Sequence, residues 1–200
     1  MRTEIRKYVI LFKAAISLIF PPYEDDSHYD KVKKICNKEI KRHPEDIFAN
    51  WFLAYAHVNQ KNYNEAQTIL ETLVSSGVNN KAVICLLSRV YFNIKDFAKV
   101  IGILEKTHIK DGDSAKYYLG ISLVELGRIK EGIDHLEKYR IHHSRDYNVL
   151  WKLGYEYFRI KEYEKALNCY IEARRLKPGV KLDEGIKLCY ERLKEDKRLK

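Results

Sequence analysis

Residues 157–166 read Tyr-Phe-Arg-Ile-Lys-Glu-Tyr-Glu-Lys-Ala, and residues 91–100 read Tyr-Phe-Asn-Ile-Lys-Asp-Phe-Ala-Lys-Val. Each stretch contains the end of one helical pattern, a turn and the start of another, and the plan recurs with substitutions in residues 57–66 and 123–132. The small residues that open the second helix follow one another at intervals of 34, 32 and 34 residues; they are Ala66, Val100, Gly132 and Ala166. A period of this size is typical of an array of helical repeats.

The composition agrees with an all-helical protein. Of the 200 residues, 46% are hydrophobic and 32% are charged, and only nine are Gly and four are Pro, which excludes a disordered or collagen-like chain. The formal net charge of +9 is compatible with binding to an anionic partner. The four cysteines form no Cys-x-x-Cys pair and lie in apolar helical patterns, so we expect reduced thiols in the core and a reducing, cytoplasmic environment.

The last copy of the repeat, residues 147–180, resembles a tetratricopeptide repeat. That family's pattern places Trp, Leu-Gly and Tyr in the first helix of a repeat, and a small residue, an aromatic residue and a closing Pro after them. The matching residues here are Leu150, Leu153, Gly154, Tyr157, Ala166, Tyr170, Ala173 and Pro178. The departure is Leu150 in place of the aromatic residue, with Trp151 one position later.

The resemblance implies an all-α fold, a right-handed helical solenoid of antiparallel helix pairs with about four to five repeats. We expect one domain over residues 1–200 that ends in a capping helix. Its parts would be an N-terminal helix with a degenerate first unit (1–46), four repeats (47–80, 81–112, 113–146 and 147–180) and the cap (181–200).

The two ends of the chain carry weaker helical patterns. In the first unit we expect a second helix over Asp30–His43, with Val32 and Cys36 facing inward. Its first helix would bury Leu11, Ala15 and Leu18, although the apolar run of residues 8–20 also fits a helix on an anionic membrane surface or an uncleaved export signal. The cap would bury Leu182, Ile186, Cys189 and Leu193.

In the family, the first helices of the repeats line a concave groove, and helical spacing selects the side chains that would face it. This face is rich in aromatic side chains, which supply large contact areas at interfaces. We expect a non-enzymatic scaffold or adaptor that binds an apolar or amphipathic peptide, or a helix of another protein, and that can also act as a chaperone. The expected groove residues are Phe48, Trp51, Tyr55, Val58, Cys85, Arg89, Phe92, Tyr117, Ile121, Val124, Trp151, Tyr155 and Phe158, with Trp151 and Tyr155 foremost.

No motif indicates catalysis, a metal or a cofactor. Gly127 and Gly132 have the spacing of a phosphate-binding loop, but Ile133 stands where its lysine is required, so this segment is interpreted as the turn of a repeat. The adjacent His142 and His143 would point apart on a helix, which argues against a metal site. The clamp of Lys, Asn and Arg that binds chaperone tails in some family members is also absent, which disfavours that partner.

Two other interpretations remain open. The basic helix around residues 31–42 gives the alternative of a helical-repeat protein that binds RNA or an anionic membrane surface, with membrane association through the N-terminal helix. Self-association is a further alternative, in which the helix of residues 5–20 fills a neighbour's groove. Binding to a polyanion would fall steeply with salt, whereas binding in an apolar groove would change little.

Overall fold

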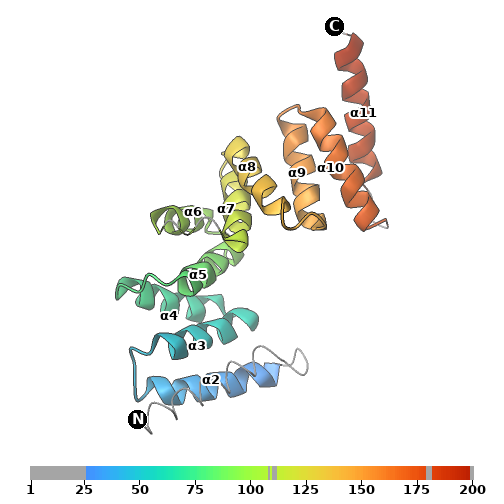
Figure 1. Ribbon diagram of the computed structural model, residues 1–200. Helices are drawn as coiled ribbons and strands as arrows, with labels where there is room; N and C mark the ends of the chain where they lie inside the picture. Colours follow the sequence, from blue (N-terminus) through green and yellow to red (C-terminus); the bar gives the residue numbers. More distant parts are fainter. Residues whose placement is uncertain (1–25, 108, 110–111, 179–181, 199–200) are drawn as a thin grey trace. The chain divides into compact units, whose positions relative to one another are not determined.

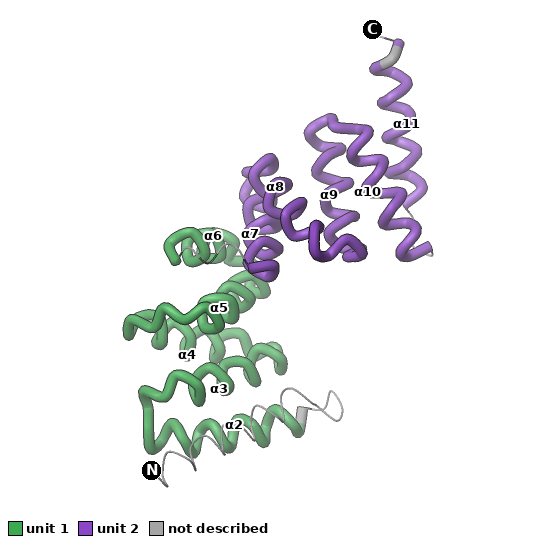
Figure 2. Tube along the Cα trace, in the orientation of Figure 1, with its two compact units in different colours: residues 1–109 green, residues 110–200 purple. Residues whose placement is uncertain are grey.

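The computed structural model describes residues 26–107, 109, 112–178 and 182–198, and every regular element in these ranges is an α-helix (Figure 1). The chain forms two compact units, unit 1 over residues 1–109 and unit 2 over residues 110–200 (Figure 2). Unit 1 holds α2 (Asp26–Ile40), α3 (Ile47–Asn59), α4 (Tyr63–Ser75), α5 (Lys81–Asn93) and α6 (Phe97–Lys106). Unit 2 holds α7 (Asp113–Glu125), α8 (Ile129–Arg140), α9 (Tyr147–Arg159), α10 (Tyr163–Leu176) and α11 (Asp183–Arg198).

A left-handed residue reverses the chain inside each of the four repeats. Lys61, Lys95, Gly127 and Lys161 have φ angles between 62° and 83° and lie between the paired helices α3–α4, α5–α6, α7–α8 and α9–α10. In each turn, the backbone N–H of the residue after the left-handed one donates to the carbonyl oxygen five residues before it. The N–H of Glu162, for example, donates to the carbonyl oxygen of Tyr157 at 2.9 Å. This is the hydrogen bond of a Schellman motif, which ends a helix at a left-handed residue. The predicted turn at Gly127 is confirmed.

Consecutive helices of unit 1 pack against one another from α2 to α6, and α3 also contacts α5. The predicted second helix of the first unit is confirmed, but it begins at Asp26 instead of Asp30 and ends at Ile40. Val32 and Cys36 are buried as expected, together with Leu53 and Ala56 of α3.

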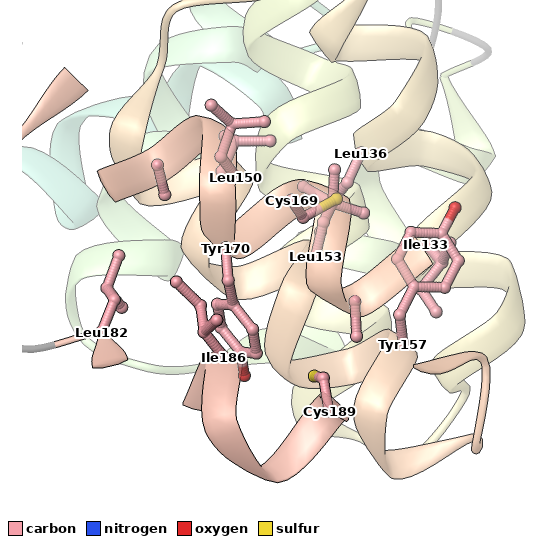
Figure 3. Close-up of a cluster of buried hydrophobic side chains, with 13 residues drawn as sticks. Ile133, Leu136, Leu150, Leu153, Tyr157, Cys169, Tyr170, Leu182, Ile186 and Cys189 are labelled. Carbon is pink, nitrogen blue, oxygen red and sulfur yellow. The ribbon is translucent and has the colours of Figure 1, made fainter. Parts of the chain in front are cut away.

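Unit 2 has a continuous core that runs from α8 to α11 (Figure 3). Tyr170 of α10 lies at its centre, because a Cβ atom built on Gly154 of α9 would be 2.8 Å from its ring and one on Gly185 of α11 would be 3.2 Å away. Of the expected inward residues of the cap, Leu182, Ile186 and Cys189 are buried and Leu193 is half-buried. The C-terminal helix therefore closes this core.

Small residues allow close helix packing, as the repeat pattern predicts. A Cβ atom on Gly132 of α8 would lie 2.6 Å from the backbone oxygen of Gly120 in α7 and 2.5 Å from the Val124 side chain. No larger residue fits between these two helices without a shift of the backbone. The other small residues of the pattern are fully buried: Ala54, Ala66, Ser88 and Ala166.

All four cysteines are free thiols. Cys36, Cys169 and Cys189 are buried and Cys85 is half-buried. Burial raises the pKa of Cys36 and Cys169 to about 12, so these two thiols stay protonated at neutral pH.

The expected first helix, with Leu11, Ala15 and Leu18, lies outside the described residues. Within the part of the chain that the structure describes, no helix is both long enough and apolar enough to cross a membrane. The expected assignment of residues 1–200 to a single domain stays a prediction.

Candidate functional site

The expected groove residues of unit 1 come from α3 and α5, and we call Phe48, Trp51, Tyr55, Arg89 and Phe92 the unit 1 face. The Trp51 and Tyr55 rings stack, with centroids 5.3 Å apart and planes inclined by 26°. Their spacing of four residues places them on adjacent turns of one helix. The Trp51 indole Nε1 also donates to the backbone oxygen of Ala82 at 3.1 Å, which fixes the indole between α3 and α5.

An apolar hollow of about 200 Å³ lies beside Trp51. Phe48 stands at this hollow with 62% of its surface exposed, which is unusual for a large aromatic side chain. The hollow is lined by Ile47, Phe48, Trp51, Phe52, Asn80, Ala82 and Val83.

The two remaining members of the unit 1 face are half-buried and held by neighbours. Arg89 donates from its guanidinium group to Oδ1 of Asn59 at 3.3 Å, and Nδ2 of Asn59 donates to the Tyr55 backbone oxygen at 2.8 Å. Phe92 contacts Phe97 of α6 edge to face, with centroids 6.1 Å apart. Arg89 therefore borders the Trp51–Tyr55 pair, whereas Phe92 packs at the turn toward α6.

The expected groove residues of unit 2 come from α7 and α9, and we call Tyr117, Ile121, Trp151, Tyr155 and Phe158 the unit 2 face. Trp151 and Tyr155 stack with nearly parallel planes, inclined by 12°, and with centroids 5.9 Å apart. The two side chains are 42% and 45% exposed, although most large aromatic surface is buried in folded proteins. The pair occupies the same repeat positions as Trp51 and Tyr55.

A group of ion pairs borders the Trp151–Tyr155 pair. Glu156 is completely buried, and its carboxylate is paired with Lys152 at 3.2 Å and with Arg159 at 2.8 Å. Lys152 also reaches Glu125 of α7 at 2.7 Å. Burial opposes the charge of Lys152, but the two carboxylates outweigh it and raise its pKa above the ordinary value. The charges beside the aromatic pair are thus already compensated, and the rings of Trp151 and Tyr155 are the exposed apolar surface next to them.

The other three members of the unit 2 face are half-buried and pack against the core. The Tyr117 ring lies 5.4 Å from that of Tyr139 in α8, and Phe158 contacts Tyr163 of α10 at 5.3 Å. Ile121 packs against the same core. The exposed surface of the unit 2 face is therefore centred on Trp151 and Tyr155.

The expectation that Val58 and Val124 face the groove is wrong, because the structure buries both. Both occupy the repeat position that holds Phe92 and Phe158 in the other two repeats, where the larger rings stay half-buried and the smaller valine side chains are covered completely. Cys85 is half-buried at the repeat position of Trp51.

Sequence reasoning missed two features of these faces. The hydrogen bond from Trp51 to Ala82 has no sequence signal, because it ends on a backbone oxygen. The ion pairs around Glu156 do have one, since Lys152 and Arg159 lie four residues before and three residues after it. Among the described residues, no group of three or more His, Cys, Asp and Glu side chains is placed to hold a metal ion.

Comparisons with known proteins agree with this repeat architecture. A model described as anaphase-promoting complex, cyclosome, subunit 3 matches residues 59–139, and a tetratricopeptide repeat model matches residues 147–179. The chain is a tetratricopeptide repeat protein. No curated protein sequence matches this tetratricopeptide repeat protein.

Solved structures similar to this tetratricopeptide repeat protein extend over most of its length. The YrrB structure, described as a TPR protein with an unusual peptide-binding site, has a TM-score of 0.67 at 17% identity and covers 82% of this chain and 92% of that chain. A structure of MamA AMB-1 has a TM-score of 0.71 at 18% identity, with coverage of 86% and 99%. Another MamA structure has a TM-score of 0.62 at 22% identity, with coverage of 70% and 78%. At these identities the likeness concerns the fold.

Proposed function

We propose that this protein is a scaffold that binds an apolar or amphipathic segment of another protein against its aromatic faces. The observation that carries the proposal is the Trp–Tyr stack, which occurs in α3 as Trp51–Tyr55 and in α9 as Trp151–Tyr155. Trp and Tyr are the residues on which binding energy most often concentrates at interfaces.

The faces are ordered before any partner arrives, which supports the proposal. Trp51 is held by its hydrogen bond to Ala82, and the flanks of Tyr155 are held by the ion pairs of Glu156. A ligand that meets ordered side chains loses less conformational entropy on binding. The hollow beside Trp51 has room for an apolar side chain of an incoming helix or extended peptide. The peptide-binding site named for YrrB adds a parallel from a protein of similar fold.

The experiment compares partner capture by the wild type and by Trp151→Ala/Tyr155→Ala. The matched control is Leu188→Ala/Tyr190→Ala, which removes two other exposed apolar side chains of unit 2 from α11, 39% and 49% exposed. Each protein is immobilised and incubated with source lysate at moderate salt, and the retained proteins are identified.

A protein retained by the wild type and by the control, but lost from the Trp151/Tyr155 variant, supports the proposal. A synthetic peptide from that protein should then bind the variant at least about 100-fold more weakly, since hot-spot side chains contribute about 2 kcal/mol or more each. Equal retention by all three proteins contradicts the proposal. If the immobilised wild type retains only further copies of this protein, the Trp151–Tyr155 surface is instead assigned to self-association.

A further inference from the structure

Arg89 of the unit 1 face is a half-buried cation without a carboxylate partner among the described residues. The other half-buried lysine and arginine side chains in that part of the chain are each paired with an Asp or Glu at 2.7–3.3 Å; they are Lys33, Lys116, Arg140 and Lys152. A cation that is partly removed from water loses hydration energy, and an ion pair compensates for that loss. At Arg89 this compensation is missing from the described residues, and an acidic ligand could supply it.

A neutral amide holds the Arg89 guanidinium group in place. Its Nη2 atom donates to Oδ1 of Asn59 at 3.3 Å, and Nδ2 of Asn93 donates to the backbone oxygen of Arg89 at 2.7 Å. A guanidinium group has five N–H donors, and the bond to Asn59 uses one of them. Arg89 is thus ordered, and its charge and its other donors remain available to a ligand.

The two helices that carry the unit 1 face contain no acidic residue. α3 and α5 have no Asp or Glu, and α5 has Lys81 and Arg89. Burial raises the pKa of Cys85 and the charge of Lys81 opposes that rise, so Lys81 lies near this face as well. By contrast, α7 and α9, which carry the unit 2 face, have three acidic and three basic residues. The helices of the unit 1 face are therefore positively charged, whereas those of the unit 2 face are balanced.

The apolar hollow and Arg89 lie at opposite ends of the unit 1 face. The hollow is lined by the N-terminal half of α3 and by the start of α5, including Ala82, whereas Arg89 meets Asn59 at the end of α3. The Trp51–Tyr55 stack lies along α3 between these two places. Because a helix rises about 1.5 Å per residue, Ala82 and Arg89 are separated by about 10 Å along α5.

We infer that the unit 1 face binds an acidic amphipathic segment of another protein, with a large apolar side chain in the hollow and an Asp or Glu side chain paired with Arg89. The inference rests on the proposed function, because it names the chemistry of the segment that this face selects. The spacing of about 10 Å corresponds to about seven residues in a helical segment and to about three in an extended one. The carboxylate accepts the charge-assisted hydrogen bonds that Arg89 does not make within the described chain.

A nucleic acid suits the unit 1 face less well. Six of the seven residues that line the hollow are apolar, and the amide oxygen of the seventh, Asn80, already accepts from the backbone N–H of Ala82. Nucleobases are recognised through hydrogen bonds to their polar edges, for which such a hollow offers few partners. A nucleic acid also gains affinity from many phosphate contacts, whereas α3 and α5 together carry Lys81 and Arg89.

The test selects binders of the full chain from a phage-displayed library of random peptides of about 16 residues, which is long enough to span the expected spacing. Each peptide is joined to the coat protein through its C-terminus, so a preference for acid reports side chains and not a terminal carboxylate. The library is first depleted on the Phe48→Ala variant, which lacks an exposed ring of the hollow. The peptides that remain therefore depend on the unit 1 face.

The most enriched peptide is then synthesised with blocked termini, and its affinity is measured for the wild type and three variants of Arg89. Arg89→Gln removes the charge, Arg89→Lys keeps it and Arg89→Glu reverses it. The control Lys106→Gln removes an exposed charge of α6 in the same unit, so its net charge equals that of Arg89→Gln. Circular dichroism confirms that all variants remain helical.

We expect the selected peptides to carry Asp or Glu at about three or about seven residues from a large apolar residue. The peptide should bind Arg89→Gln about 10- to 100-fold more weakly than the wild type, because hydrogen bonds to a charged group are lost. Lys106→Gln should change the affinity less than about threefold, and Arg89→Lys should retain most of it. Arg89→Glu should prefer a copy of the peptide with Lys at the acidic position, a reversal that a folding defect would not produce.

Equal affinity of the peptide for Arg89→Gln and for the wild type would overturn the inference and leave the proposed function intact, because that peptide still depends on Phe48. If no peptide remains after depletion, the inference fails together with the proposed role of the unit 1 face. A parallel titration uses single-stranded poly(U) RNA. If the wild type binds poly(U) through Arg89 and selects no peptide, the face is assigned to a nucleic acid and the inference is wrong.

Discussion

The hydroxyl group of Tyr157 in α9 donates a hydrogen bond of 2.9 Å to Oε1 of Glu137 in α8. Tyr91 of α5 and Glu71 of α4 form the same contact at 2.8 Å, with both residues 66 positions earlier. Burial, followed by the hydrogen bond to the carboxylate, raises the pKa of both tyrosines. The contact thus joins the second helix of one repeat to the first helix of the next in each unit.

Tyr157→Phe should lower the free energy of unfolding by about 1–2 kcal/mol, because a hydrogen bond to a charged acceptor is lost while the ring still packs. Urea denaturation followed by circular dichroism measures the effect. The control is Tyr163→Phe, because Tyr163 has a ring contact with Phe158 and its hydroxyl group donates only to the exposed amide oxygen of Asn93, at 3.2 Å. This change should stay within about 0.5 kcal/mol. Similar losses for the two variants would show that the Glu137 contact contributes little.

Gly102 and Gly127 should respond in opposite ways to replacement by Ala. Neither position has an atom within 4 Å of the added Cβ, so backbone conformation alone decides the outcome. Gly127 has a φ of 83°, and Gly127→Ala should cost about 1 kcal/mol. Gly102 lies inside α6, and Gly102→Ala should stabilise by about 0.5–1 kcal/mol. Thermal denaturation shows whether each variant is more or less stable than the wild type. If both variants gain stability or both lose it, the expectation is wrong.

Gly132→Ala should destabilise unit 2 by about 2–3 kcal/mol, because its methyl group would overlap the backbone of α7. Gly102→Ala is again the control, since it adds the same methyl group to a helix with open space around it. The two variants are compared by their midpoints of urea denaturation, which report stability when the dependence of the unfolding free energy on urea concentration is the same. A loss below about 0.5 kcal/mol at Gly132 would mean that α7 and α8 separate readily.

His57 should make unit 1 less stable in acid. Burial is the main cause that lowers the pKa of this histidine, nearby Lys33 adds to it, and Glu65 opposes it. The unfolded chain, with an ordinary histidine pKa near 6.5, therefore binds the proton more readily than the folded chain. The stability that neutral His57 contributes is present above about pH 6.5 and is lost as the pH falls below it.

His57→Phe should remove this part of the pH dependence, because Phe retains an aromatic ring and takes up no proton. Urea midpoints at about pH 7.5 and about pH 5.5 measure it, and the wild type should lose more stability between them than the variant. Equal losses would show that His57 is protonated as easily in the folded chain as in the unfolded one.

The repeat period could predict the helices and most of the core, because a small residue recurring every 32–34 residues leaves few alternatives. Buried Ala66 and Ala166 and the turn at Gly127 follow directly from that spacing. The start of α2 was harder to predict, because Asp26–Tyr29 has no apolar periodicity and only Tyr29 of this stretch packs against the core shared with α3.

The candidate faces could be predicted only in part. Spacing placed Trp151 and Tyr155 on one side of α9, but it also assigned Val58 and Val124 to the groove, because a helical pattern shows which side of a helix a residue lies on and not how much of its side chain the neighbours cover. Which rings stay exposed depends on neighbours from other helices, as Tyr117 against Tyr139 shows.

Cys85 occupies the repeat position that holds Trp51, Tyr117 and Trp151 in the other three repeats, and it is the one half-buried thiol among three buried ones. The wild-type protein therefore has one half-buried thiol, that of Cys85, to which a fluorophore can be attached. Because burial raises the pKa of this thiol, a maleimide dye would couple best on the alkaline side of neutrality. A dye at Cys85 would report occupancy of the unit 1 face by its change in emission, without any engineered residue.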